Sequence, residues 1–315
     1  IKEMKKKIYA ALVLAGLTAV VGCKDFLDVN TNPNGPEKVS PNLYLASIES
    51  SLALGVQFDA RYMGKYVQNF VSITANDTWD RHGYLPVSDA GGELWKSVYW
   101  KMGMNNEDMI NLSLNQQRWD LAGIGYALKA WGFQALTDVH GEIIITEAFK
   151  PENFVFKYDT QEFAYEKVRS LCDSALVLLN RTDGTVSQSY TAKGDIMYKG
   201  DRAKWIKFVY AVKAVNAAHL SNKTDKYKPA EVIEFVNKAF STNDDDALIP
   251  FNGVVNSDAN FFGPFRNNIG SFVQSEFITN ALNGTVFSGV SDPRISALLV
   301  KADDALHRVI IHYLL

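Results

Sequence analysis

The chain has 315 residues, of which 47% are hydrophobic and 21% charged, and this composition supports a large apolar core and excludes bulk disorder. Its 32 basic and 35 acidic side chains give a formal charge of −3, so no cationic field indicates a nucleic-acid partner. Aromatic side chains make up 12% of the residues, and we expect some of them to lie outside the core.

The first 22 residues have the order of parts found in a secretory signal. Lys5, Lys6 and Lys7 form a positive region, residues 8–21 form an uncharged apolar stretch, and small residues then precede Cys23. The apolar stretch is shorter than the roughly 20 residues that a bilayer-spanning helix needs. We therefore expect residues 1–22 to be cleaved.

The junction at residues 20–23, Val-Val-Gly-Cys, resembles the bacterial lipobox, in which the cysteine thiol receives a diacylglycerol before cleavage. An ordinary signal peptide that happens to contain a cysteine is the alternative, but the three signal parts align and favour lipidation at Cys23. Lys24, Asp25 and Asp28 resemble the charged tag of Bacteroidetes lipoproteins that face outward from the outer membrane. We therefore expect a lipid-anchored protein at the cell surface that does not span the membrane.

Loss of residues 1–22 removes four lysines and one glutamate, which changes the formal charge from −3 to −6. The mature chain then has no disulfide, because Cys23 carries lipid and Cys172 has no partner. Cys172 lies on an apolar stripe with helical spacing, which predicts a small buried core residue.

Helical spacing of apolar residues dominates the chain after an Asn-, Pro- and Gly-rich tether at residues 23–40. In residues 43–71 we expect a break near Phe58 and Asp59, and Gly141 is well placed to end a later helix. Residues 247–285 are rich in Gly and Asn, and few stretches alternate as strands do. The predicted helices, in chain order, are 43–57, 61–71, one from about 93, 108–116, 118–139, 161–180, 201–221 and 229–240. The pattern predicts a mainly α fold of antiparallel, tetratricopeptide-like helix pairs with long irregular loops, although no fixed-period repeat is present.

Two irregular segments combine flat aromatic faces with hydrogen-bonding side chains, as sugar recognition requires. The first lies in residues 74–92, where the alternative is a structural loop whose Trp79 packs on the helices. The second lies in residues 260–272, where the clustered Phe side chains favour a loop anchor while Arg and Asn are candidate sugar contacts. The other five Trp residues lie in predicted helices, and we expect them to serve packing. The candidate glycan contacts are Asn76, Asp77, Trp79, Asp80, Arg81 and Tyr84 in the first segment and Phe261, Arg266 and Asn267 in the second.

Motifs of common enzymes are absent from the sequence. It has no His-Glu-x-x-His, no Gly-x-Ser-x-Gly and no phosphate loop, so we expect neither catalytic residues nor a cofactor. The run at residues 243–246, Asn-Asp-Asp-Asp, lacks the glycine and distal Glu of a calcium loop. We interpret it as a solvated turn and predict no metal site.

Several segments together resemble the SusD/RagB family of Bacteroidetes outer-membrane lipoproteins, in its SusD-like branch. They are CKDFLDVN at 23–30, WKSVY at 95–99 with Asn105 and Asn106, GYALKAWGFQALTDVHGE at 125–142, TEAF at 146–149 and SDPR at 291–294. The resemblance implies tetratricopeptide-like helix pairs beside ligand-holding loops, glycan or related nutrient binding, no catalysis, and a SusC-like TonB-dependent transporter as partner. Family members are longer and the match ends near Leu299, so we expect a helical domain at 41–300, C-terminally truncated, and a tail at 301–315 unrelated to it.

Two other functions are compatible with the sequence. A surface glycoside hydrolase needs two carboxylates at a fixed separation across a cleft, which sequence alone cannot place. A helical scaffold that binds only protein needs no small ligand.

Overall fold

A computed structural model describes residues 39–72, 92–150, 152–255, 259–261 and 272–299, together with Glu3. The chain divides into two compact units, Ile1–Ser40 and Pro41–Leu315, and the helical fold belongs to the second. Its longer helices are α2 (Asn42–Tyr66), α5 (Gly103–Asn115), α6 (Trp119–His140), α7 (Gln161–Leu179), α9 (Arg202–Ala218) and α10 (Pro229–Lys238). The shorter elements are β1 (Phe70–Ser72), α4 (Glu93–Lys96), η1 (Ser97–Lys101), α8 (Gln188–Thr191), η2 (Asn243–Asp245), β2 (Phe272–Gln274), α11 (Glu276–Leu282) and α12 (Ile295–Leu298). The prediction of a mainly α fold is confirmed.

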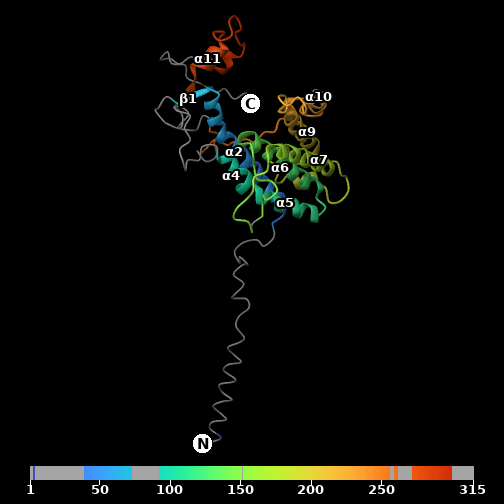
Figure 1. Cartoon of the computed structure of the whole chain (residues 1–315). Coiled ribbons are helices and arrows are strands. Elements are labelled where there is room, and N and C mark those ends of the chain that lie inside the picture. Colours follow the sequence, from blue (N-terminus) through green and yellow to red (C-terminus); the bar gives the residue numbers. More distant parts are fainter. Residues whose placement is uncertain are drawn as a thin grey trace. The chain divides into compact units, whose positions relative to one another are not determined.

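The central helix of the core is α6, which packs against α5, α7 and α9 (Figure 1). Its interior face carries fully buried apolar residues such as Leu121, Ile124 and Leu128. Gly123 brings α6 close to α7, because a β-carbon there would lie 2.7 Å from Cγ of Leu179. The helix ends at Gly141, whose φ of 80° lies in the left-handed region that favours glycine.

The predicted break at Phe58 and Asp59 is wrong, because α2 is continuous from Asn42 to Tyr66. A mid-helix aspartate suggested a helix end, but Asp59 is buried, and its Oδ2 accepts a hydrogen bond from the backbone N–H of Leu94 at 2.8 Å. Its carboxylate therefore accepts from a backbone N–H that has no partner within the first turn of α4, a segment distant in the sequence. The chain leaves the helical conformation after Tyr66 and enters β1 instead of continuing helically to residue 71.

A two-stranded antiparallel sheet joins two segments about 200 residues apart in the sequence. β1 pairs with β2 in the register Phe70 with Gln274, Val71 with Val273 and Ser72 with Phe272. Three-residue strands are too short to show alternation in a sequence, so this pair was not predicted.

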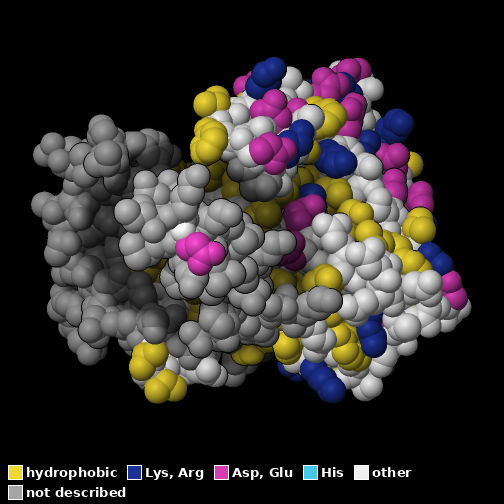
Figure 2. Space-filling view, turned by 90° about the horizontal axis from the view of Figure 1, so that it is seen from below, with side chains coloured by type: hydrophobic (Ala, Val, Ile, Leu, Met, Phe, Trp, Pro, Cys, Tyr) yellow, Lys and Arg dark blue, Asp and Glu magenta, His cyan; other side chains and the backbone are white. Residues whose placement is uncertain are grey.

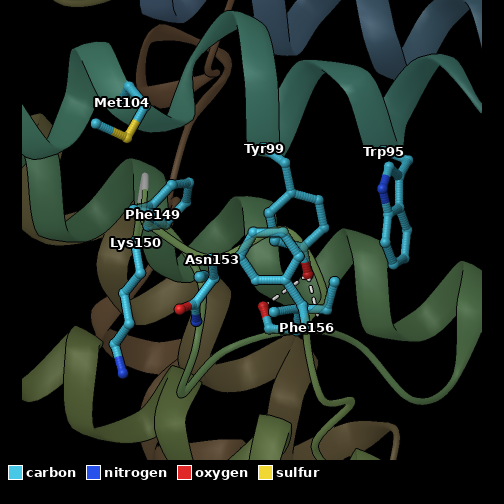
Figure 3. A pocket seen from close by; sticks show the side chains of 9 residues that line it. Trp95, Tyr99, Met104, Phe149, Lys150, Asn153 and Phe156 are labelled. Atoms are coloured by element: carbon cyan, nitrogen blue, oxygen red, sulfur yellow. Dashed lines mark hydrogen bonds between the residues drawn. The ribbon is translucent and has the colours of Figure 1, made fainter.

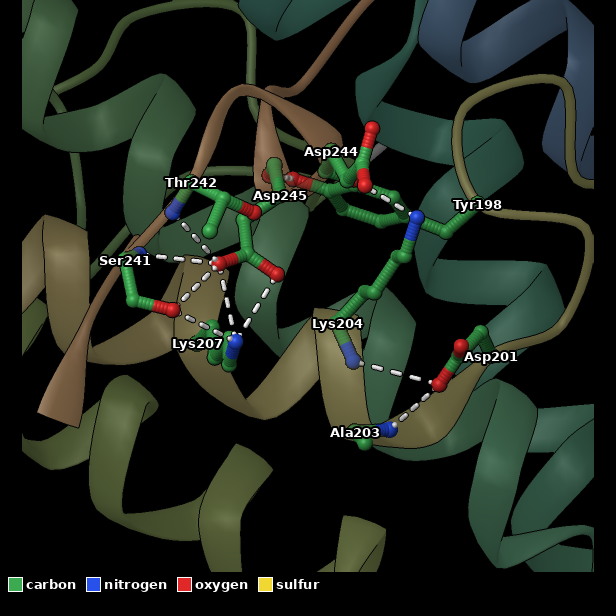
Figure 4. A network of polar contacts seen from close by, with 9 residues as sticks. All are labelled: Tyr198, Asp201, Ala203, Lys204, Lys207, Ser241, Thr242, Asp244 and Asp245. Atoms are coloured by element: carbon green, nitrogen blue, oxygen red, sulfur yellow. Dashed lines mark hydrogen bonds and ion pairs between the residues drawn. The ribbon is translucent and has the colours of Figure 1, made fainter.

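The acidic run at residues 243–246 is not simply a solvated turn. Asp245 is only 4% exposed, and its carboxylate pairs with Nζ of Lys207 at 2.8 Å. The same carboxylate accepts hydrogen bonds from the backbone N–H groups of Ser241 and Thr242 (Figure 4). The hydroxyl of Tyr198 donates to the backbone oxygen of Asp245 at 2.8 Å. This network fastens η2 to the first turns of α9, where Asp201 caps the helix by accepting from the backbone of Ala203.

The buried position predicted for Cys172 is confirmed. Burial raises the pKa of its thiol to about 12. Among the described residues, no helix is both long and apolar enough to cross a membrane. On the face drawn in Figure 2, the described basic and acidic side chains are interspersed and do not gather into a patch of one sign.

Candidate ligand-binding pocket

The first wall of the pocket is the helical run formed by α4 and η1. η1 is a π-helical turn, a geometry that is found frequently at functional sites. Trp95 and Tyr99 project from this run toward the loop that follows α6 (Figure 3). The centroids of their rings are 4.8 Å apart, and Tyr158 stacks on Trp95 at 5.9 Å with an interplanar angle of 28°. Aromatic neighbours therefore hold this wall in place.

The hydroxyl of Tyr99 joins the wall to the loop. It donates to the backbone oxygen of Ile144 at 2.7 Å and accepts from the backbone N–H of the same residue at 2.8 Å. Burial raises the pKa of Tyr99 well above its usual range, so the phenol stays protonated at neutral pH and keeps its role as a donor.

The ring of Phe149 continues the aromatic lining beside Tyr99, with the centroids of the two rings 6.1 Å apart. Its backbone has a φ of 61°, a left-handed conformation that costs a non-glycine residue free energy. The ring stacks on Phe133 with an interplanar angle of 12°, and its Cε1 would lie 2.1 Å from a β-carbon at Gly103. Only a residue without a side chain at position 103 leaves space for the ring.

Asp159 shapes the loop that carries Phe149. Its Oδ2 accepts hydrogen bonds from the backbone N–H groups of Ile145 and Thr146, both at 2.8 Å, and its Oδ1 accepts from the Thr146 hydroxyl. Burial opposes ionisation of this carboxyl, but the hydrogen bonds from Thr146 and Ile145 outweigh burial and lower its pKa. An ionised Asp159 thus holds the start of the loop at neutral pH.

Together these parts enclose a cavity of about 350 Å³, within the size range of small-molecule sites. Flat side chains dominate its walls, while Lys150 and Asn153 supply hydrogen-bonding groups. Figure 3 shows both polar side chains extending away from the helical run that carries Tyr99. The described lining residues are Trp95, Tyr99, Met104, Ile144, Ala148, Phe149, Lys150, Asn153 and Phe156. Because none of them is a carboxylic acid, this lining provides no pair of carboxyl groups for acid–base hydrolysis.

Of the glycan contacts predicted from the sequence, the structure describes Phe261. The candidates at 76–84, with Arg266 and Asn267, lie outside the described residues. Phe261 is described and is 1% exposed; its ring lies edge-on to Phe58 with centroids 6.4 Å apart. Its backbone N–H donates to Oε1 of Gln57 at 2.6 Å. Phe261 is therefore buried in the way expected of the loop anchor that the clustered Phe residues favoured.

The expectation that all five helical Trp residues serve packing is correct for Trp205, which is fully buried, but wrong for Trp100, which is 76% exposed. Trp95 forms part of the pocket wall. Tyr99 and Phe149 were not predicted as site residues, because the pocket joins segments separated by about 50 residues. One signal was available: residues 149–158 contain three Phe and one Tyr in a stretch without helical period.

The described residues thus form a mainly helical fold with an aromatic-lined pocket. The chain belongs to the SusD-like family, because the family model described as "Starch-binding associating with outer membrane" matches residues 33–313. The match extends beyond Leu299, where the sequence motifs predicted that it ends.

Solved structures show the same fold. A SusD/RagB family protein from Bacteroides thetaiotaomicron is 20% identical, with a TM-score of 0.67 over 87% of this chain and 57% of the other. A chitin-binding SusD homolog from Flavobacterium johnsoniae is 18% identical, with a TM-score of 0.63 over 84% of this chain and 55% of the other. The chain thus spans somewhat more than half the length of these two proteins. No curated protein sequence matches the chain at a significant level.

Proposed function

We propose that this protein is a cell-surface lipoprotein that binds oligosaccharides and delivers them to a SusC-like TonB-dependent transporter. In this proposal Cys23 carries the lipid that anchors the protein in the outer membrane. The description of the family, as starch-binding and associated with the outer membrane, supports both the class of ligand and the location.

The observation that carries the proposal is the aromatic pocket between η1 and the loop after α6. A sugar ring has an apolar face that packs on aromatic side chains, and hydroxyl groups that need hydrogen-bond partners. Trp95, Tyr99 and Phe149 supply flat surfaces, and Asn153 supplies an amide that both donates and accepts. The residues predicted at 76–84, with Arg266 and Asn267, stay candidates for further sugar contacts.

Isothermal titration of the chain from residue 23, with Cys23 replaced by Ser, tests the proposal. The probes are maltohexaose and chitohexaose, which represent the starch and chitin named for the family and for a solved neighbour. We expect saturable binding of at least one of them, weakened about tenfold by Trp95→Ala, which corresponds to about 1.4 kcal/mol. Trp79→Ala tests the loop predicted from the sequence in the same way.

Trp100→Ala is the matched control. Trp100 lies on the same helical run, is largely exposed and does not line the pocket, so we expect its loss to leave affinity unchanged. Circular dichroism and thermal unfolding of each variant separate loss of binding from loss of fold. Binding of peptides with no binding of any glycan would refute the proposed ligand class.

Two further measurements address the rival functions. Chromatography of each oligosaccharide after prolonged incubation should show no shortened product, and product formation would instead identify a glycoside hydrolase. Affinity purification from outer membranes that express the lipidated protein should recover a TonB-dependent transporter. Recovery of the transporter without glycan binding would favour the protein-binding scaffold.

A further inference from the structure

The described lining of the pocket carries a positive formal charge. Among its described lining residues, Lys150 carries the one formal charge, and it makes no ion pair with another described residue. The same loop carries four carboxylates, and none of them lines the pocket. Glu147 accepts from the backbone N–H of Lys157 at 2.8 Å, and Asp159 accepts from the backbone N–H groups of Ile145 and Thr146. The other two, Glu142 and Glu152, are exposed. An ammonium group thus stands beside an aromatic cavity that has no carboxylate among its described lining residues.

Two other lysines near the pocket are neutralised. Nζ of Lys129 lies 2.6 Å from Oε1 of Glu107, and Lys101 pairs with Glu93. Lys129 also lies over the ring of Phe149, 5.1 Å from its centroid, behind the pocket wall. Lys150, by contrast, has no ion-pair partner among the described residues. The chain as a whole has a negative net charge, and an unpaired cation at the cavity would attract anions locally in spite of it.

The polar side of the pocket suits a carboxylate. In Figure 3 the side chains of Lys150 and Asn153 extend on the same side of the loop, away from Tyr99. An ammonium group and an amide N–H can both donate to one carboxylate, and the attraction is stronger beside apolar walls than in bulk water. A ring placed against Tyr99 and Phe149 would direct a substituent toward this pair.

We propose that this pocket selects sugar units that carry a carboxylate, that is, uronic acids, and that Lys150 is the cation that pairs with them. The inference rests on the proposed function, since it assumes that the ligand is an oligosaccharide. Neutral sugars would use the same aromatic walls without the ionic contact.

Titration of the chain from residue 23, with Cys23→Ser, with tetragalacturonate and with neutral maltotetraose tests the proposal. We expect tetragalacturonate to bind at least tenfold more tightly in 50 mM NaCl and to lose most of this advantage in 500 mM NaCl, because salt screens the ion pair. Lys150→Met should remove the preference, because it weakens the binding of tetragalacturonate by a larger factor than the binding of maltotetraose.

Lys157→Met is the matched control, because Lys157 is an exposed cation on the same loop that does not line the pocket. We expect it to keep the preference and its salt dependence. Circular dichroism of both variants verifies that the fold is retained.

Each alternative outcome has a distinct meaning. Equal affinity for the acidic and neutral sugars, or a preference that survives Lys150→Met, overturns the selection for uronic acids and leaves the proposed function standing. Absence of binding to these two sugars and to the hexasaccharides overturns the proposed function as well. Binding of a tetraglutamate peptide as tight as that of tetragalacturonate overturns the assignment to a sugar acid.

Discussion

Glu49 of α2 and Asp195 of the segment before α9 place two carboxyl groups side by side in the core. They are 0% and 1% exposed, respectively. Burial, followed by the neighbouring Asp195 carboxylate, raises the pKa of Glu49 to about 9. Asp195 in turn accepts hydrogen bonds from Nε1 of Trp205 at 2.8 Å and from two backbone N–H groups. The carboxyl group of Glu49 is therefore protonated at neutral pH.

This proton makes the free energy of unfolding depend on pH. The pKa of Glu49 is higher in the folded than in the unfolded chain, so between about 4.5 and 9 folding takes up a proton and stability falls as pH rises. One proton contributes a slope of at most about 1.4 kcal/mol per pH unit. We expect Glu49→Gln to flatten the dependence measured by urea unfolding at pH 6, 7 and 8. Glu162→Gln, at an exposed glutamate, is the control and should keep the pH dependence. Parallel curves for the wild type and Glu49→Gln would contradict a proton held on Glu49.

Gly103→Ala should disturb the pocket. The new β-carbon would meet Cε1 of Phe149 at 2.1 Å, so the ring must move. We expect a loss of about 1–3 kcal/mol in the free energy of unfolding, as in other overpacked sites, together with weaker oligosaccharide binding. Gly132→Ala is the comparison, since its β-carbon would lie 3.4 Å from the nearest side chains in ordinary contact. Chemical denaturation and titration of both variants test this, and equal effects of the two substitutions would argue against the clash.

Asp245→Ala should loosen η2 from α9. The substitution removes the acceptor for Lys207 and for the backbone of Ser241 and Thr242. The hydrogen bond from Lys207 and those from Ser241 and Thr242 hold the pKa of Asp245 well below its usual range. Its contribution to stability is therefore present above pH 4 and is lost as pH falls below that range.

We expect Asp245→Ala to lower the midpoint of thermal unfolding at pH 7 by several degrees. Asp244→Ala is the control, because Lys204 bonds to the backbone oxygen of Asp244, which the substitution keeps. A similar loss in both variants would show that general charge, and not the Asp245 network, stabilises this turn.

Cys172 should be unreactive in the folded protein. Its thiol is buried and its pKa of about 12 leaves almost no thiolate at pH 8. In the chain from residue 23 with Cys23→Ser, an aromatic disulfide reagent should modify Cys172 only after denaturant is added. Rapid modification of the folded chain would mean that the α7 interface opens readily.

Much of the helical framework could be predicted from the sequence, because helix formation depends on neighbours within one or two turns. The bounds of α6, α7 and α9 follow from apolar spacing, from Asp201 as a cap and from Gly141 as a stop. The family was recognisable for a related reason, since its motifs are short and lie in order along the chain.

The tertiary structure alone decided the roles of residues whose partners are distant in sequence. The sequence around Asp59 is typical of a helix end, but in the structure Asp59 accepts a hydrogen bond from the backbone of Leu94. The sequence around Asp245 is typical of a solvated turn, but in the structure Asp245 forms an ion pair with Lys207. The pocket exists because residues 95–104 meet residues 144–156, and Gly103 leaves space for Phe149. The sequence by itself determined the helices and the family, which depend on local order, whereas side-chain environment and pocket shape arise only from long-range packing.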